Sequence, residues 1–389
     1  LAVSLATQSW AADLSQGETV QIWGTAVNNS SLMLDDADIA LKQADHLSDL
    51  LRAQPGVDIG GAHSLNQRIN IRGFQDLDLE VTIDGARQNN FMYHHAGNLL
   101  INADILKAVD VQVGTNSVLN GGLAGGAAFE TKDAKDLLQP GQQFGARVHG
   151  NYASNDYHSF SVTGYGQLTE KLDVLAYMNT VARNNPEDGQ GVETLGNDGD
   201  IDNGLLKLGL DLNAENRLEF SFDRYADEGH YAPRPDMGVA TNASISGTIV
   251  YPTEFKRETA TLNYELDKGD LINLRATLYQ NTMTLWRDYL AGGTSRPVQH
   301  RISEGESEHT GLNLLAETVA ELGAQEHTLR YGAEVYNQKT TSTFDGVKFG
   351  GEEADASAVF IEDEIGFANG LIVTPGIRYN RYTLDTAAN

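Results

Sequence analysis

The sequence predicts a mainly β protein in which an N-terminal α/β domain precedes a transmembrane antiparallel β-barrel. After about residue 140, apolar and polar residues alternate over segments of about ten residues. The connections between these segments are alternately short and long. Both patterns are typical of bacterial outer-membrane barrels. The 389 residues contain no apolar run of 18, so we expect no membrane-spanning helix.

The composition excludes several functional classes. The formal net charge of −27 would repel a phosphate backbone, so nucleic acid is not an expected partner. The absence of cysteine excludes thiolate metal sites, disulfides and thiol nucleophiles. No spacing of a nucleophile with a base and an acid occurs, and no glycine loop that would bind phosphate. We therefore predict that the protein is not an enzyme.

Both ends of the chain are unusual. The apolar stretch Leu1–Ala6, followed by Ser9-Trp10-Ala11, is typical of the end of a secretory signal peptide, so residues 1–11 are interpreted as signal and the mature chain as starting near Ala12. A frayed apolar start is the alternative. At the other end, residues 382–389 stop in sequence typical of a strand running into a loop. We expect a fragment of a longer protein.

Residues 28–140 have the short mixed elements of a compact α/β domain, preceded by an N-terminal segment at 12–27. A helix is predicted over 45–52, because Leu47, Leu50 and Leu51 are apolar and Pro55-Gly56 follows as a stop. Strands are predicted over 68–72 and 79–84, where apolar and polar residues alternate. A second helix, over 103–107, is predicted to run into a strand over 108–113.

The strands predicted within residues 141–389 each have one apolar and one polar face. In Leu206-Lys-Leu-Gly-Leu-Asp-Leu212 nearly every second residue is leucine. A barrel would turn the apolar face to lipid and the polar face, with Lys207 and Asp211, to its lumen. The leucines expected to face lipid are Leu206, Leu208, Leu210, Leu262 and Leu266. A soluble sandwich would show the same alternation.

The lengths of the connections favour the barrel over a sandwich. The short connections are predicted at 155–156, 169–171, 214–216, 268–270, 323–325 and 369–370, and the long ones at 184–203, 225–251, 291–303 and 340–355. Only the first connection, at 155–156, departs from this order, because it is short on the side of the long loops. Short turns at one end and longer loops at the other are typical of an up-and-down outer-membrane barrel, whereas a Greek-key sandwich has no reason to keep this order. About eleven strands fit, an odd number, so the barrel is expected to be incomplete.

Four motifs resemble the plug domain of TonB-dependent outer-membrane receptors over residues 45–139. These are Arg68-Ile-Asn-Ile-Arg-Gly73, Val81-Thr-Ile-Asp-Gly-Ala-Arg-Gln88, Ile105–Gly114 and Leu119–Gly126 with Glu130-Thr-Lys132. Val113 and Ala127-Ala-Phe129 depart from the family pattern. The resemblance implies a plug inside a barrel, with about 11 of an expected 22 strands present.

The resemblance also implies an energy-coupling partner and a location. Glu18-Thr-Val-Gln-Ile22 is similar to the TonB box, which adds as a strand to TonB, the partner linked to an energising complex in the inner membrane. The site residues implied are Glu18, Thr19, Val20, Gln21 and Ile22. The expected location is the outer membrane of a Gram-negative bacterium, with its lipid around the barrel.

Within the family, the chain is most similar to the haem and haemoglobin receptor branch. The similarity lies in Asp84–Gln88, His94-His95, Ile105–Lys107 and Phe129–Leu138. It implies that His95, or else His94, is one axial ligand of haem iron, with haem a transported ligand rather than a permanent cofactor. Haem would come free or from a haem-carrying protein. The alternative is that both histidines are exposed polar residues without a role in binding haem.

Three functions remain open from the sequence. The first is TonB-dependent import of haem into the periplasm for iron acquisition. The second is import of a ferric siderophore or another metal chelate. The third is a non-transport barrel or a soluble β protein. The sequence also leaves open whether Arg68, Arg72 and Arg87 pair with wall carboxylates such as Glu219 and Glu334, or within the plug.

Overall fold

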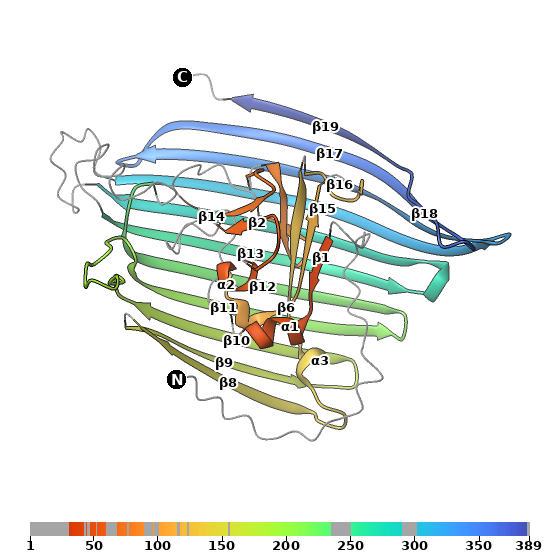
Figure 1. The fold of residues 1–389 in the computed structure, drawn as a ribbon, viewed down its shortest axis with the longest axis horizontal. Coiled ribbons are helices and arrows are strands. Elements are labelled where there is room, and N and C mark those ends of the chain that lie inside the picture. Colours follow the sequence, from red (N-terminus) through yellow and green to blue (C-terminus); the bar gives the residue numbers. More distant parts are fainter. Residues whose placement is uncertain are drawn as a thin grey trace.

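The computed structural model describes residues 31–42, 44, 47–51, 53–59, 68–75, 78–88, 96, 101–114, 117–122, 124–154, 156–234, 250–289 and 302–386. These residues form a mainly β structure in which a long curved sheet wraps around a smaller N-terminal body (Figure 1). We call residues 31–138 the plug and strands β8–β19 the wall. Within the described ranges, no helix is long and apolar enough to span a membrane.

The plug is built on a five-stranded sheet in the order β1-β6-β7-β4-β5, beside a small β2-β3 pair. β4 and β7 are parallel, and the other neighbours are antiparallel. One core of buried side chains includes Leu50, Leu51, Val81, Val109 and Phe129. The elements are β1 (Ser31–Leu34), α1 (Asp36–Lys42), α2 (Leu47–Leu51), β2 (Val57–Ile59), β3 (Ile69–Ile71), β4 (Glu80–Ile83), β5 (Ala86–Arg87), the 3₁₀ turn η2 (Ala103–Ile105), β6 (Leu106–Val113), β7 (Gly125–Thr131) and α3 (Ala134–Leu137).

Most of the elements predicted for the plug are present, with two differences. α2, β3 and β4 lie inside the segments predicted as helix and strands. The helix predicted over 103–107 is only the turn η2, because Leu106 pairs with Thr131 and already belongs to β6. Helix α1 was not predicted. It is preceded by Asp35, whose side chain accepts a hydrogen bond from the Asp38 amide at 2.9 Å.

The wall is one antiparallel sheet in sequence order. Its described strands are β8 (Phe144–Ala153), β9 (Tyr157–Gln167), β10 (Leu172–Arg183), β11 (Asp198–Asn213), β12 (Asn216–Tyr231), β13 (Tyr251–Asp267), β14 (Asn273–Asp288), β15 (Ile302–Leu322), β16 (Gln325–Phe344), β17 (Val347–Phe367), β18 (Ile372–Val373) and β19 (Gly376–Thr386). β18 and β19 both pair with β17, so these 12 strands occupy 12 − 1 = 11 positions. This confirms the predicted number of about eleven.

The two faces of the wall are those that the alternation predicted. Leu206, Leu210 and Leu262 are exposed on the outer face at 39%, 37% and 44%, and Leu208 and Leu266 are partly exposed. Lys207 points inward and is only 4% exposed. Outward leucines would face hydrocarbon, while inward polar groups meet the plug.

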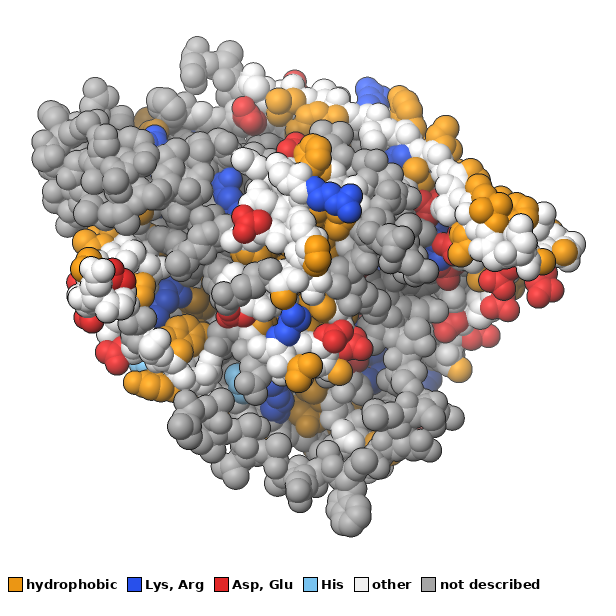
Figure 2. All heavy atoms as spheres, viewed as in Figure 1, with side chains coloured by type: hydrophobic (Ala, Val, Ile, Leu, Met, Phe, Trp, Pro, Cys, Tyr) orange, Lys and Arg blue, Asp and Glu red, His pale blue; other side chains and the backbone are white. Residues whose placement is uncertain are grey.

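Most of the short connections lie at one end of the wall, the right-hand end in Figure 1, where Figure 2 also shows a group of acidic side chains. The short connection between β8 and β9 lies at the opposite end, with the long connections. One predicted long connection is wrong. Residues 340–355 are not a loop, because β16 and β17 continue through them and turn at Asp345-Gly346. Both turn residues have positive φ, 50° and 77°, which is the geometry of a two-residue type I′ hairpin.

Candidate functional site: the contact of plug and wall

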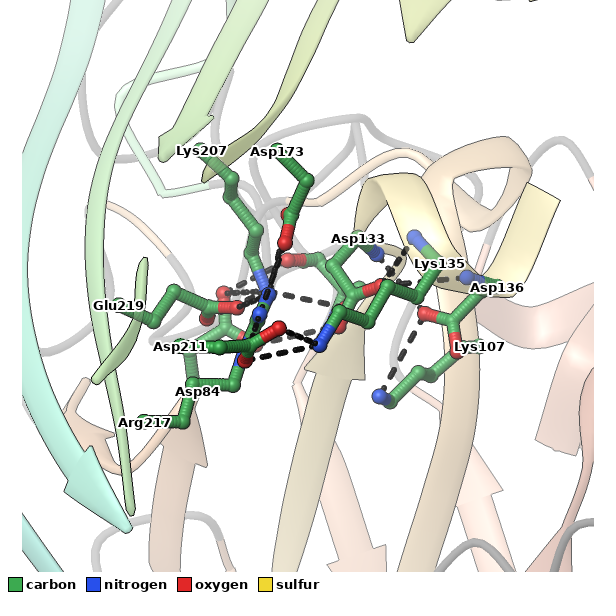
Figure 3. Close-up of polar contacts among 11 residues, drawn as sticks. Asp84, Lys107, Asp133, Lys135, Asp136, Asp173, Lys207, Asp211, Arg217 and Glu219 are labelled. Atoms are coloured by element: carbon green, nitrogen blue, oxygen red, sulfur yellow. Dashed lines mark hydrogen bonds and ion pairs between the residues drawn. The ribbon is translucent and has the colours of Figure 1, made fainter. Parts of the chain in front are cut away.

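Lys207 of β11 lies at the centre of the contact between plug and wall (Figure 3). Its Nζ is 3.4 Å from a carboxylate oxygen of Asp84 in the plug and 3.3 Å from one of Glu219 in the wall. It also donates a hydrogen bond to the Thr131 carbonyl at 3.1 Å. Asp84 in turn accepts from the Thr131 amide and hydroxyl at 2.9 and 2.6 Å. One lysine thus ties the β4–β5 turn and the end of β7 to the wall.

A second set of ion pairs attaches α3 to the ends of β10–β12. Lys135 of α3 is 2.7 Å from Asp211 of β11. Arg217 of β12 donates to Asp211 at 3.0 Å and to both carboxylate oxygens of Asp173 at 2.7 and 3.0 Å. With the Lys207 group these residues form what we call the anchor network, drawn in Figure 3: Asp84, Lys135, Asp173, Lys207, Asp211, Arg217 and Glu219.

Apolar and polar contacts beside the anchor network complete this side of the plug. Ile105 and Ala134 are buried against three wall residues, Leu175, Tyr177 and Leu205. Nearby, the Asp104 carboxylate accepts from the Ser161 hydroxyl at 2.6 Å and pairs with Arg147.

Asp104 and Asp133 both stay ionised, although the side chain of Asp104 is buried and that of Asp133 is partly buried. Burial alone would raise the pKa of Asp104, but the Arg147 guanidinium lowers it below the usual value. Burial would also raise the pKa of Asp133, but the nearby cations Lys107, Lys207 and Arg217 together lower it. Asp133 then serves as the N-cap of α3 and accepts hydrogen bonds from the Lys135 and Asp136 amides. A helix N-terminus favours a negative charge.

A cavity of about 170 Å³ separates the plug sheet from the wall on the opposite side, along β14–β17. The polar face of the plug sheet lines it, with Glu80, Asp110 and Glu130 among its residues. Glu130 pairs with Arg275 of the wall at 2.6 Å. Burial raises the pKa of Asp110 to about 6. The cavity on this side is therefore lined by both charged and apolar side chains and leaves room for water.

Ala96 of the plug contacts the wall at the end of the barrel wall where the long connections lie. It is 2% exposed and belongs to a buried cluster. The other members are Val181, Ile201, Tyr225, Tyr231, Phe255, Met283 and Leu285. The Arg68 guanidinium donates to the Ala96 carbonyl at 3.4 Å. Wall charges lie nearby, with Arg183 2.9 Å from Asp227.

Family models match both parts of this architecture. The TonB-dependent receptor plug domain matches residues 16–128, and the TonB-dependent receptor-like β-barrel matches residues 148–389. The chain belongs to the TonB-dependent receptor family. A soluble β protein and a barrel unrelated to transport receptors are therefore excluded. The domain limits at residues 28, 140 and 141 stay predictions.

Curated relatives of this TonB-dependent receptor cover most of the chain. The heme transporter BhuA of Brucella ovis is 27% identical over 349 residues, 88% of this chain and 50% of the relative. The hemin receptor of Yersinia pestis is 26% identical over 344 residues, 86% of this chain and 49% of the relative. The chain thus spans about half the length of these relatives.

Solved receptor structures share the fold. The FrpB iron transporter of Neisseria meningitidis has a TM-score of 0.77 at 18% identity, covering 92% of this chain and 60% of that one. The hemophore receptor HasR of Serratia marcescens, in complex with HasA and heme, has a TM-score of 0.74 at 21% identity, covering 91% and 52%. The ferric enterobactin receptor PfeA of Pseudomonas aeruginosa gives 0.71 at 18%, covering 92% and 59%.

The predicted site residues of the receptor fall outside the described part of the chain. His94 and His95 lie between the described residues 88 and 96, and Glu18–Ile22 lies before residue 31. Neither assignment is tested. In the described ranges, no group of three His, Asp or Glu residues is arranged to hold a metal ion.

The structure answers part of the question of whether the plug arginines pair within the plug or with wall carboxylates. In most of the described ion pairs between plug and wall the cation belongs to the wall, and Lys135 of the plug, paired with Asp211, is the exception among them. Arg87 lies 3.4 Å from Glu80 within the plug and 4.7 Å above the wall ring of Tyr336. Among the described contacts, Glu219 and Glu334 pair with wall cations. Where plug and wall do pair at Lys207 and Arg275, the cation belongs to the wall. The alternation predicted that Lys207 faces inward, but not its partner Asp84, which is 123 positions away (207 − 84).

Proposed function

We propose that this chain is part of a receptor that binds haem at the cell surface and imports it across the outer membrane of a Gram-negative bacterium. Membership of the TonB-dependent receptor family supports active transport. In this proposal haem is the cargo, the receptor has no permanent cofactor, and it catalyses no chemical reaction. TonB supplies the energy through the segment Glu18–Ile22.

The observation that carries the haem assignment is the match to BhuA, named a heme transporter, over 88% of the chain. That match extends through plug and wall together. The structural similarity to FrpB and PfeA, at 18% identity, reflects the fold alone and carries no information about cargo. Relatives named hemin receptor and heme receptor A point to the same ligand class.

We propose His95, with His94 as the alternative, as an axial ligand of haem iron from the plug side. Ala96 directly follows His95 and is buried against the wall at the end of the long connections. This position of Ala96 supports a role for the residues that precede it in binding cargo from the extracellular side. Neutral imidazole is a good axial ligand for haem iron.

The test is a haem titration of the full-length receptor, followed by the Soret band. Wild type is compared with His94→Ala and His95→Ala, and His158→Ala serves as the matched control because it is exposed beside a short connection. One of the first two variants should shift the band and weaken binding at least tenfold. Because only unprotonated imidazole ligates iron, binding should also weaken below about pH 6. Unchanged spectra in both variants would remove these histidines as ligands.

A ferric siderophore or another metal chelate is the second candidate cargo. The family models describe the plug and the barrel and do not distinguish one cargo from another. The same titration with a ferric catecholate separates the two, since a siderophore receptor should bind the catecholate and leave the haem Soret band unchanged.

A further inference from the structure

The outer face of β14–β17 has an apolar groove of about 520 Å³. It is lined by Leu274, Leu314, Ala316, Leu329, Tyr331, Gly332, Ala333, Phe360 and Ile361. Direct cross-strand partners lead from Leu262, which faces outward, through β14 and β15 to Val335 of β16. Tyr331 is four residues before Val335 and so lies on the same face. The groove is therefore part of the surface that meets hydrocarbon.

Small residues on the outer face create the groove. Ala316 is only 4% exposed although it faces outward, so it forms the floor. At Gly332 a Cβ would lie 2.6 Å from the Phe360 Cζ, so the Phe360 ring lies against the bare backbone of that glycine. Leu314 and Phe360 line both this groove and the cavity between plug and wall. Groove and cavity therefore lie back to back, with one sheet between them.

The groove lies in the periplasmic half of the apolar band. On β16 the outward side chains are apolar or aromatic from Leu329 to Val335, and polar at His327 and Asn337 on either side. Leu329 and Tyr331, which line the groove, are the members of this set nearest the short turn that joins β15 to β16. Short turns of outer-membrane barrels face the periplasm. An occupant of the groove would thus come from the periplasmic leaflet, which contains phospholipid rather than lipopolysaccharide.

Polar groups border the groove at its periplasmic end. The Tyr331 hydroxyl is 3.4 Å from the Thr318 Oγ1. Asp363, the direct partner of Leu329, has its Oδ2 2.9 Å from the His327 Nδ1. The Asp363 side chain is 27% exposed, and its Oδ1 accepts no hydrogen bond from the described residues. A carboxylate with an unused acceptor attracts an ammonium group and repels an anionic headgroup.

We propose that the groove binds one phospholipid of the periplasmic leaflet, with an acyl chain over Ala316 and the ammonium headgroup of phosphatidylethanolamine at Asp363. This inference rests on the proposed function only in placing the wall in an outer membrane. Among the described residues that line the groove there is no lysine or arginine, so nothing there favours an anionic lipid such as phosphatidylglycerol. The formal net charge of −27 acts in the same direction.

A bound acyl chain would support the wall at a place where a cavity lies on its other side. The chain would cover Leu314 and Ala316 from outside, and so supply dispersion contacts that an empty groove lacks. Phosphatidylethanolamine should therefore raise the unfolding temperature of the wall, and this rise should be absent when the groove is filled by a larger side chain.

Two pairs of variants separate the acyl chain from the headgroup. Ala316→Leu fills the floor of the groove, and Ala260→Leu is its matched control, since Ala260 is an outward residue of β13 outside the groove. Asp363→Asn removes the charge at the headgroup end. Its control is Asp355→Asn, an outward carboxylate of the same strand that is bonded to Asn337 on the extracellular side of the apolar band.

The deciding measurement is native mass spectrometry of the full-length receptor, incubated in detergent with equal amounts of phosphatidylethanolamine, phosphatidylglycerol and lipopolysaccharide. Wild type and Ala260→Leu should keep one phosphatidylethanolamine, and Ala316→Leu should keep at least tenfold less. Asp363→Asn should keep a phospholipid without preference between the two, and Asp355→Asn should keep the preference. Equal retention by wild type and Ala316→Leu would overturn the proposal, as would wild-type preference for either anionic lipid or a receptor dimer that Ala316→Leu dissociates.

A photoactivatable acyl chain gives a second measurement that needs no variant to fold. Phosphatidylethanolamine carrying this chain, in nanodiscs with the wild-type receptor, should label the peptides of Leu314 and Tyr331 at least tenfold more than that of Leu262. Even labelling around the wall would contradict a specific site. Haem binding by the same samples separates the two proposals: a receptor that keeps phosphatidylethanolamine but binds no haem contradicts the haem assignment alone, and one that binds haem with an empty groove contradicts the phospholipid site alone.

Discussion

At the scale of single residues, the contact between plug and wall depends on charges placed inside a barrel lumen. Lys207 is almost fully buried and has carboxylates from both the plug and the wall within 3.4 Å. Lys135, in the same network, has a side chain that is 45% exposed. Two lysines that bridge plug and wall therefore differ mainly in burial, and burial decides how much an ion pair is worth.

Replacing Lys207 with Met should loosen the plug far more than the same change at Lys135. Lys207→Met leaves Asp84 buried without its cation, which typically costs about 3–5 kcal/mol. Lys135→Met removes a partly exposed pair worth about 0–1 kcal/mol. Calorimetry of the full-length receptor should show a lower plug transition for Lys207→Met only. Equal transitions in the two variants would show that the network does not hold the plug.

Asp110 should make the plug less stable as the pH rises. Its pKa is raised from 3.8 to about 6, so between these values the folded plug binds more protons than the unfolded chain and stability falls with increasing pH. The penalty is absent below about pH 4 and complete above about pH 6. At 1.4 kcal/mol per unit it amounts to about 3 kcal/mol.

Asp110→Asn tests this penalty directly. The variant should be more stable than wild type at pH 7.5 and equal to it at pH 4, as measured by the plug transition at each pH. The comparison cancels the titration of Glu130 and Glu334, which line the same cavity. A stability difference that does not change with pH would contradict the assignment.

At the scale of elements, the wall strands separate lipid from lumen by strict alternation. Leu206 and Lys207 are neighbours in β11, yet the first is 39% exposed on the outer face and the second is buried inside. A shift of one residue in register would place the lysine in hydrocarbon, at a cost of about 2–4 kcal/mol at mid-depth.

A lipid-confined thiol reagent should therefore label Leu208→Cys and spare Lys207→Cys in the full-length receptor. Leu208 lies on the outer face of the strand and Lys207 on the inner face. Labelling is read by mass spectrometry after delipidation, with Leu262→Cys of β13 as a second outward position. Preferential labelling of Lys207→Cys would invert the wall and contradict the register.

The sequence correctly predicted the faces of wall strands that have lipid on one side and the plug on the other. It did not predict the strands where this constraint ends. Hydrocarbon outside and plug inside impose alternation, so the faces of β11 and β13 could be predicted. Residues 340–355 are mostly polar, with Phe344, Val347, Phe349 and Ala354 as the apolar side chains, so the alternation is weak although the strands continue. Asp345-Gly346 is a sequence typical of a two-residue hairpin turn and could have predicted the turn found there. Polar composition alone suggested a loop there.

At the scale of the whole molecule, the receptor combines a plug with two kinds of contact to its wall. On the side of β9–β12 the contact is apolar and paired by buried charges. On the side of β14–β17 it contains a cavity lined by both charged and apolar side chains. The residues of these contacts could be predicted to face inward, but their partners could not, because pairs such as Asp84 with Lys207 depend on how distant segments fold together.

The proposed receptor draws its energy from TonB through the N-terminal segment. Haem uptake by cells that express the full-length receptor is the most direct measurement of this coupling. Val20→Pro removes a backbone N–H from the segment Glu18–Ile22, so strand pairing with TonB should fail. We expect this variant to bind haem with wild-type affinity but no longer to support growth on haem as the sole iron source. The control Val20→Thr keeps the N–H and a β-branched side chain, so cells expressing it should still grow on haem. Growth of the Val20→Pro strain at the wild-type rate would contradict this coupling.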